Sequence, residues 1–236
     1  MKSFFPYYGG KLLTAKRYPP PRFRTVFEPF AGAAGYATKY EPEYAILFDL
    51  DESVCGTWDY LIRSKESEIL SLPLKVTNVD DIKVVQEARW LIGWWLAPGR
   101  SVPSKVPTSW IKKWMIGNNR SVWCDHTRAR LASQVHKIKK WLIKQESYAE
   151  APDIRTTWFV DPPYVGKVGD GYTVKGRLLN YYLLGTWCKS RRGQVIVCEQ
   201  GGADWLPFEK LMVVKKRNAK VSGGGSRTEM IWESMS

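Results

Sequence analysis

The residues with the most specific chemistry in this sequence are an acid, two prolines and a tyrosine, Asp161-Pro162-Pro163-Tyr164. The prolines fix a rigid turn and carry no N–H donors, which leaves carbonyl oxygens free to accept. The Asp161 carboxylate and the Pro162 carbonyl can accept both N–H bonds of a conjugated amino group, so that its lone pair is localised for attack on a methyl sulfonium. Tyr164 would then supply a face on which an extruded base stacks. The pattern predicts catalysis by alignment and charge complementarity, and the alternative is a proline turn without function.

A run of small residues lies much earlier in the chain, between a short β-prone segment and a helical stretch that ends near residue 40. It reads Glu28-Pro29-Phe30-Ala31-Gly32-Ala33-Ala34-Gly35. Small residues at such a turn let the backbone approach a ligand closely. No Gly-Lys-Ser/Thr follows, so the turn is not a P-loop. A tight strand-to-helix turn that binds nothing is the alternative.

Asp49 ends the next β-prone segment, about 20 residues after the start of that turn, where an acid commonly accepts hydrogen bonds from ribose hydroxyls. Asp51 is the neighbouring candidate. Asp51 is equally suited to cap the helix that follows it.

The elements expected to position these residues alternate between strands and helices. Such alternation predicts an α/β fold with a mixed, mostly parallel sheet covered on both faces, whose ligands bind at the carboxyl ends of the strands. The expected strands are residues 25–27, 44–48, 141–143, 157–160, 194–198, 211–216 and 230–233, and the expected longer helices are residues 52–64, 84–96, 126–141 and 178–190. The last two strands are joined by a Gly-rich loop.

Residues 65–140 differ in character from the rest of the chain and are interpreted as an insertion into a core formed by residues 1–64 and 141–236. Residues 98–125 are rich in Pro, Ser, Trp and basic side chains, and residues 126–141 have the pattern of a basic amphipathic helix. The net charge is +13, from 36 Lys plus Arg against 23 Asp plus Glu. A basic balance favours a nucleic-acid partner, and a solvated basic surface is the alternative.

The cysteine and histidine inventory argues against a metal site or Cys–His catalysis. The four cysteines have no zinc-binding spacing, and the two histidines, His126 and His136, are too far apart for one helix turn. No run of about 18 apolar residues and no secretory signal is present. The sequence therefore predicts a cytoplasmic protein of a bacterial or phage-infected cell, with reduced thiols, no metal and no membrane partner.

Taken together, the motifs resemble those of Dam-like DNA adenine methyltransferases, particularly phage-type members. That family opens with aromatic-x-Gly-Gly-Lys, to which residues 7–11 are similar, and its cofactor turn reads Glu-Pro-Phe-x-Gly-x-Gly. Residues 28–34 match this turn except that Ala34 replaces the last glycine, with Gly35 beside it. Asp49 matches the acid after the second strand, and residues 161–164 match the family's Asp-Pro-Pro-Tyr, in the family's order. The resemblance is weakest at residues 65–140.

The resemblance implies a Rossmann-like class I S-adenosylmethionine-dependent methyltransferase fold with a mostly helical target-recognition insertion. It implies transfer of a methyl group to the exocyclic amino group of an adenine flipped out of double-stranded DNA, by a monomer or weak dimer. Residues 147–150 fall where the family often contacts the adenine of the cofactor. The implied cofactor-binding residues are Tyr7, Tyr8, Gly9, Gly10, Lys11, Glu28, Pro29, Phe30, Ala31, Gly32, Asp49 and Asp161.

DNA contacts are expected from basic residues of the insertion and from the edges of the late Gly-rich loop. Trp110, Trp114 and Trp123 either wedge into DNA or pack internally, and most of the twelve tryptophans are expected in the core. The predicted DNA-binding residues are Lys105, Lys112, Lys113, Arg120, Arg128, Arg130, Lys216 and Arg227, with Lys215 and Arg217 on either side of Lys216.

Three other functions remain open at this point. An RNA base methyltransferase, for example one that modifies a guanine amino group, can carry the same Asp-Pro-Pro-Tyr motif. Cytosine amino methylation is less favoured, because its motif usually begins with Ser. A catalytically silent DNA-binding protein, such as an antirestriction or regulatory factor, would not need the intact motif.

Overall fold

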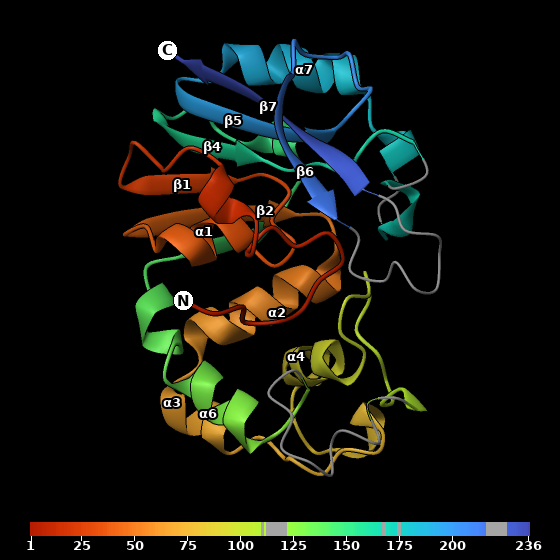
Figure 1. Ribbon diagram of the computed structural model, residues 1–236. Helices are drawn as coiled ribbons and strands as arrows, with labels where there is room; N and C mark the ends of the chain where they lie inside the picture. The colour runs from red at the N-terminus through yellow and green to blue at the C-terminus, as the bar shows by residue number, and fades with distance from the viewer. Residues whose placement is uncertain (110, 112–121, 167–168, 174–175, 216–225) are drawn as a thin grey trace.

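The computed structural model describes residues 1–109, 111, 122–166, 169–173, 176–215 and 226–236. Within these residues the fold is built on a seven-stranded sheet with the order β3-β2-β1-β4-β5-β7-β6 (Figure 1). The strands are β1 Thr25–Glu28, β2 Tyr44–Asp49, β3 Leu142–Gln145, β4 Thr156–Val160, β5 Gly193–Gln200, β6 Glu209–Lys215 and β7 Ser226–Met235.

Strand direction divides the sheet into a parallel part and a terminal hairpin. Strands β3, β2, β1, β4 and β5 pair in parallel, whereas β7 pairs antiparallel with both β5 and β6. The α/β class and the mixed, mostly parallel sheet are therefore confirmed. A mostly parallel sheet that ends in an antiparallel hairpin is consistent with the class I methyltransferase fold.

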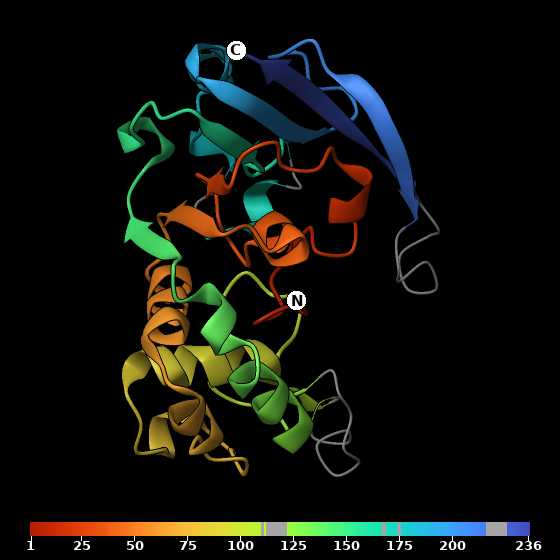
Figure 2. The ribbon, with the colours of Figure 1, turned by 90° about the vertical axis from the view of Figure 1, so that its left-hand side faces the viewer.

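The helices flank this sheet and extend beyond one of its ends. The α-helices described are α1 Gly35–Tyr40, α2 Glu52–Arg63, α3 Glu66–Leu70, α4 Gln86–Leu96, α6 Asp125–Ala132 and α7 Tyr181–Ser190. Short 3₁₀ turns are η1 Ala15–Arg17, η2 Val79–Asp81, η3 Val135–Ile138, η4 Tyr148–Glu150, η5 Gly169–Gly171 and η6 Gly176–Leu178. Helices α3, α4 and α6 lie beyond α2, away from the sheet (Figures 1 and 2).

The central strand β4 shows why the sheet is covered on both faces. All five of its residues are buried, as expected for a continuous apolar run in a parallel sheet. Its side chains alternate between two cores: Phe159 packs with α1 and α2, whereas Trp158 and Val160 pack with α7. Phe27 of β1 stacks on Trp158 with ring centroids 4.5 Å apart. The α7 helix and the α1–α2 pair therefore occupy opposite faces.

Two helix predictions are corrected by the structure. The helix expected over residues 126–141 ends at Ala132, and η3 follows it. Gln134 is buried there, and its side chain accepts a hydrogen bond from the Lys2 backbone N–H at 2.8 Å, so a long-range contact interrupts the local helical pattern. The helix expected from residue 178 begins at Tyr181, because the Asn180 side chain caps it by accepting from the Leu183 N–H.

The predicted insertion is joined to the core by continuous apolar packing. Trp94 of α4 donates its indole N–H to Thr57 of α2 at 3.1 Å and stacks on Phe5. Trp123 is also buried, and it donates to the Pro73 carbonyl. It therefore packs internally rather than being placed to wedge into DNA. The division at residues 64/65 and 140/141 stays a prediction.

No helix in the described parts of the chain is long and apolar enough to cross a membrane. The four cysteines are buried free thiols.

Candidate active site

A cavity of about 380 Å³ opens where β1, β2 and β4 end, at the carboxyl edge of the parallel strands. The sequence predicts ligands at this edge. The lining includes every residue of the predicted cofactor set, and it also includes Ser147 and Tyr148 but not the neighbouring Ala149 and Glu150. That set is Tyr7, Tyr8, Gly9, Gly10, Lys11, Glu28, Pro29, Phe30, Ala31, Gly32, Asp49 and Asp161. The structure thus gathers three distant sequence motifs around one space, while their binding role stays a prediction.

The turn after β1 forms one wall of the cavity, and its shape depends on left-handed backbone. Gly32 has φ +45°, and a Cβ atom there would lie 2.9 Å from the Tyr7 ring. The Gly32 carbonyl accepts from the Trp58 indole at 2.8 Å, which anchors the turn to α2. Ala34 also has a positive φ, +43°, at the position where the family pattern has glycine. A residue with a Cβ in this conformation costs roughly 1–2 kcal/mol, so the departure at Ala34 is accommodated with strain.

The two acids after β2 have different structural roles. Asp49 accepts from the Gly32 N–H at 2.8 Å and from the Asp51 N–H at 3.0 Å, and burial raises its pKa to about 6. Asp51 caps α2 by accepting from the Ser53 and Val54 N–H groups. The capping role considered for Asp51 is therefore present, although Asp51 also reaches the cavity wall.

Glu28 is a buried carboxyl group at the floor of the same turn. Only 2 % of the residue is exposed, and its Oε1 accepts from the Ala37 N–H of α1 at 2.7 Å. Burial raises the pKa of Glu28 to about 8, although the hydrogen bond from Ala37 acts in the opposite direction. The carboxyl group is therefore mostly neutral in the folded protein below that pH.

Replacing Glu28 with glutamine is expected to stabilise the fold increasingly as pH rises. The folded pKa lies above the ordinary value of 4.5, so the stability that the neutral carboxyl contributes is complete below pH 4.5 and is lost as pH approaches 8. Glutamine stays neutral, and its advantage should reach on the order of a few kcal/mol at pH 8. Thermal unfolding between pH 4.5 and 8 measures the difference in stability between Glu28→Gln and the native protein. Glu52→Gln, at an exposed position, is the control. Parallel pH profiles for Glu28→Gln and the native protein would contradict the assignment.

A buried ammonium, that of Lys11, and a partly buried carboxylate, that of Asp161, form an ion pair at the other wall of the cavity. The Lys11 ammonium donates to Asp161 Oδ1 at 2.6 Å and to Oδ2 at 2.9 Å, although the residues are 150 positions apart. The ammonium also lies 3.7 Å from Glu229 Oε1. Burial alone would lower the pKa of Lys11, but the carboxylates of Asp161 and Glu229 outweigh burial and raise it. Lys11 is therefore a fixed positive charge beside the predicted catalytic acid.

Tyr164 is placed differently from its predicted role. Only 3 % of it is exposed, its hydroxyl donates to Glu229, and the Lys11 ammonium lies 4.6 Å from its ring centroid. The ring therefore offers no open face to a stacked base in this structure, and Tyr164 is not part of the cavity lining, nor is Pro162. The Pro163 carbonyl is also not free, because the Tyr181 hydroxyl donates to it at 2.7 Å. Asp161 and Pro163 are the members of the motif that reach the cavity.

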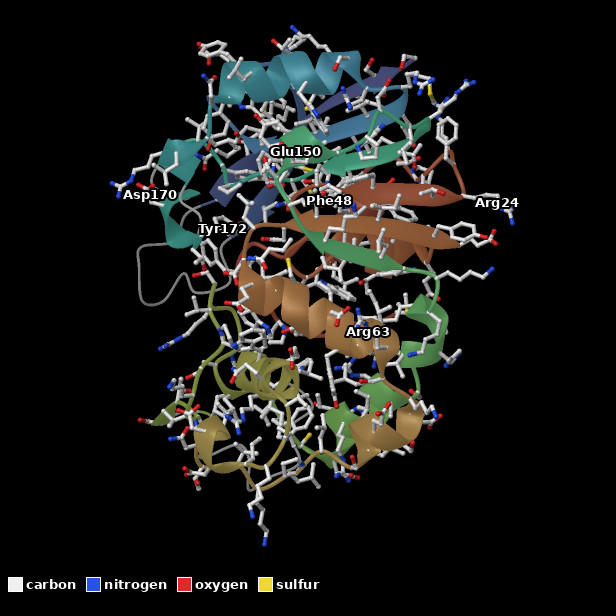
Figure 3. The ribbon with its side chains drawn as sticks, turned by 180° about the vertical axis from the view of Figure 1, so that it is seen from behind. Arg24, Phe48, Arg63, Glu150, Asp170 and Tyr172 are labelled. Carbon is white, nitrogen blue, oxygen red and sulfur yellow. The ribbon has the colours of Figure 1, made fainter. Side chains whose placement is uncertain are left out.

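Several residues of the site were not predicted from the sequence. Tyr172 lines the cavity and packs edge-to-face on Tyr8 with ring centroids 5.1 Å apart, on the short segment that also carries Asp170 (Figure 3). Leu178, Leu179 and Asn180 also line the cavity. Glu229 lies under the Lys11–Asp161 pair. An aromatic residue after a Gly-rich bend was the available signal for Tyr172, but no local pattern marks Glu229.

The placement of the predicted DNA-binding residues changes the role of two of them. Arg128 donates to the Leu72 carbonyl at 2.8 Å and to Asp125, and Arg130 donates to the Ser3 carbonyl at 2.8 Å. The Arg128 guanidinium thus links two parts of the insertion, and that of Arg130 joins the insertion to the N-terminal segment, so their predicted DNA contact has no support here. Lys105 is exposed and paired with Asp80. Lys112, Lys113, Arg120, Lys216, Arg217, Trp110 and Trp114 lie outside the described residues, as do the side chains of Lys215 and Arg227.

No protein-family model matches the sequence, and no curated protein matches it. Among solved structures, the chain is similar to a "putative methylase" from Haemophilus influenzae, over 90 % of this chain and 80 % of that chain. The TM-score is 0.33 and the sequence identity is 9 %. A likeness at this level carries no argument about activity, so the function is argued from the geometry of the site.

Proposed function

We propose that the chain is an S-adenosylmethionine-dependent methyltransferase that modifies the exocyclic amino group of a flipped-out adenine in double-stranded DNA. The observation that carries the proposal is the cavity at the carboxyl edge of β1, β2 and β4, which joins the predicted cofactor turn to Asp161. A concave site at this edge, with few polar groups converging on it, is the usual position for a ligand in such a sheet.

The lining fits the proposed cofactor in charge and in shape. The cofactor supplies a methyl group on a positively charged sulfur, and the cavity presents the acids Asp49 and Asp161 beside the mostly neutral Glu28, with Lys11 as the one ammonium among its described lining residues. The absence of a side chain at Gly32 leaves the turn open beside Tyr7, where a Cβ would collide. Asp49 remains the candidate acceptor for ribose hydroxyls, because it lines the cavity and its carboxylate is held by backbone N–H groups.

Asp161 supports the proposed chemistry by accepting a hydrogen bond from the target amino group rather than by abstracting its proton. The nitrogen forms a bond to the methyl carbon as the bond from sulfur breaks, the neutral thioether form of the cofactor leaves, and the nitrogen then releases one proton to solvent. Its carboxylate reaches the cavity and is held by a permanent positive charge on Lys11. A carboxylate oxygen that accepts one N–H of the target amino group orients the nitrogen lone pair. Preorganised charge of this kind usually contributes more than the movement of a proton.

Adenine in DNA is favoured over the alternatives by residue type and charge. The motif begins with an acid rather than with Ser, which favours adenine over cytosine. The order of the motifs favours DNA over RNA. The net charge of +13 favours a polyanionic partner over a small molecule. An intact motif beside a complete cavity favours an enzyme over a silent DNA-binding protein.

The decisive experiment incubates the protein with labelled S-adenosylmethionine and unmethylated DNA or RNA, and then identifies the modified nucleoside. Methylated adenine in DNA is the expected product. Methylated adenine that appears only in RNA would overturn the DNA substrate. A titration that detects no binding of S-adenosylmethionine would exclude every methyltransferase, including the RNA alternative.

A further inference from the structure

A buried carboxylate on the last strand completes the ion-pair cluster of the cavity wall. Glu229 of β7 has no exposed surface. Its Oε1 accepts from the Tyr18 hydroxyl at 2.6 Å and from the Tyr164 hydroxyl, and it lies 3.7 Å from the Lys11 ammonium. Lys11 therefore has two carboxylates within reach, Asp161 in direct contact and Glu229 slightly farther away.

The proposed reaction bears directly on this cluster. Both oxygens of Asp161 accept from Lys11 in this structure, so the carboxylate that is proposed to hold the amino group is at the same time held by the ammonium. Turning this carboxylate toward the amino group weakens its contacts with Lys11. The ammonium is 3 % exposed and cannot simply move into water. A buried charge that loses its partner is strongly disfavoured unless a second partner is in place.

We propose that Glu229 is a positioning residue that receives the Lys11 ammonium when Asp161 turns to the amino group of the substrate. This inference rests on the proposed function. Lys11 keeps its proton throughout, so one ammonium and two carboxylates are present before and after the shift. Only the hydrogen-bond partners are exchanged.

The distances suit such an exchange. A movement of about 1 Å brings the ammonium from 3.7 Å to ordinary hydrogen-bond range of Glu229 Oε1, which is roughly 2.7–3.2 Å. The receiving carboxylate is itself fixed. Its two phenol donors come from separate segments, and β7 is paired on both sides, with Glu229 opposite Gln200 of β5 and opposite Met212 of β6. The carboxylate therefore stays in place while the flexible lysine side chain moves.

The test compares the Glu229→Gln and Glu229→Asp variants in single-turnover methylation of unmethylated plasmid DNA with labelled S-adenosylmethionine. Glutamine keeps the size of Glu229 but not its charge, so the Lys11 ammonium stays on Asp161. The methylation rate of Glu229→Gln should therefore fall by about 30-fold or more, while its affinity for the cofactor stays within about twofold of the native value. Aspartate keeps the carboxylate and should restore the rate to within about fivefold of the native value.

Glu199→Gln is the matched control. Glu199 is a second buried carboxylate at the end of a neighbouring strand, and it accepts from the Trp205 indole at 3.1 Å and from the Val165 N–H. Burial raises the pKa of Glu199 to about 7, so its loss measures the cost of removing a buried carboxyl group that is not within salt-bridge distance of Lys11. An unchanged rate in Glu229→Gln would overturn the proposal, as would parallel losses of rate and cofactor affinity or equal losses in Glu229→Asp. A native protein that binds cofactor but methylates nothing would instead refute the proposed function, and this inference with it.

Discussion

The Asp161→Ala variant is expected to lose methylation by a factor of about 10² to 10³ or more, while DNA binding stays within about twofold. The carboxylate is the polar side chain of the motif that reaches the cavity. Its removal takes away the acceptor for the target N–H, and it leaves the Lys11 ammonium beside the substrate position. Single-turnover rates, a cofactor titration and a DNA gel-shift assay separate these effects.

Two further variants sharpen this expectation. Asp161→Asn keeps the shape of the side chain but offers a weaker acceptor to Lys11 and to the substrate, so it should also be severely impaired. Asp170→Ala removes an exposed acid from η5, close to Tyr172 in Figure 3, and should retain near-native turnover. Undiminished methylation by Asp161→Ala would refute the catalytic role.

Gly32→Ala is expected to weaken cofactor binding by about tenfold or more, which corresponds to roughly 1.4 kcal/mol. The added Cβ would lie 2.9 Å from the Tyr7 ring, and the backbone φ of +45° is already unfavourable for a side chain. Tyr7 cannot retreat without cost, since it packs edge-to-face on Trp94 with ring centroids 5.4 Å apart. A titration with S-adenosylmethionine measures the loss.

Gly99→Ala provides the matched comparison, because Gly99 also has a positive φ, +84°, but nothing lies within 4 Å of an added Cβ. Both variants carry a backbone penalty of roughly 1–2 kcal/mol, which thermal unfolding should show. Only Gly32→Ala should lose cofactor affinity. Equal cofactor affinity in the two variants would mean that the turn at Gly32 does not contact the cofactor.

The parts of the fold that sequence predicts well are those fixed by local pattern. Continuous apolar runs identify β4 and β5, and small residues after β1 identify the turn at the cavity, since a tight turn between strand and helix admits few residue types. The late hairpin is longer than predicted: β7 begins at Ser226 rather than at residue 230. Charged and polar residues at the start of β7 hide its strand character.

The errors arise where distant residues decide the local outcome. The break after Ala132 depends on Gln134 reaching the Lys2 backbone, which no local pattern reveals. Arg128 and Arg130 have a composition typical of a DNA-binding surface, yet carbonyls of Leu72 and Ser3 hold them. The burial of Tyr164 follows from its hydrogen bond to Glu229, 65 positions away. A motif read alone therefore predicts which side chains matter better than it predicts which way they face.

The position of β7 between β5 and β6 also determines when a newly synthesised chain can complete its cavity wall. Tyr18 and Glu229 are 211 positions apart, and the contact between them needs the last strand to insert into a sheet whose other strands precede it in the chain. Contacts of such long sequence separation form late and slowly. A partly synthesised chain would carry the small-residue turn at residues 28–35 and Asp161, but not yet the Glu229 carboxylate beneath Lys11. The ion-pair cluster is therefore complete only after the last strand has joined the sheet.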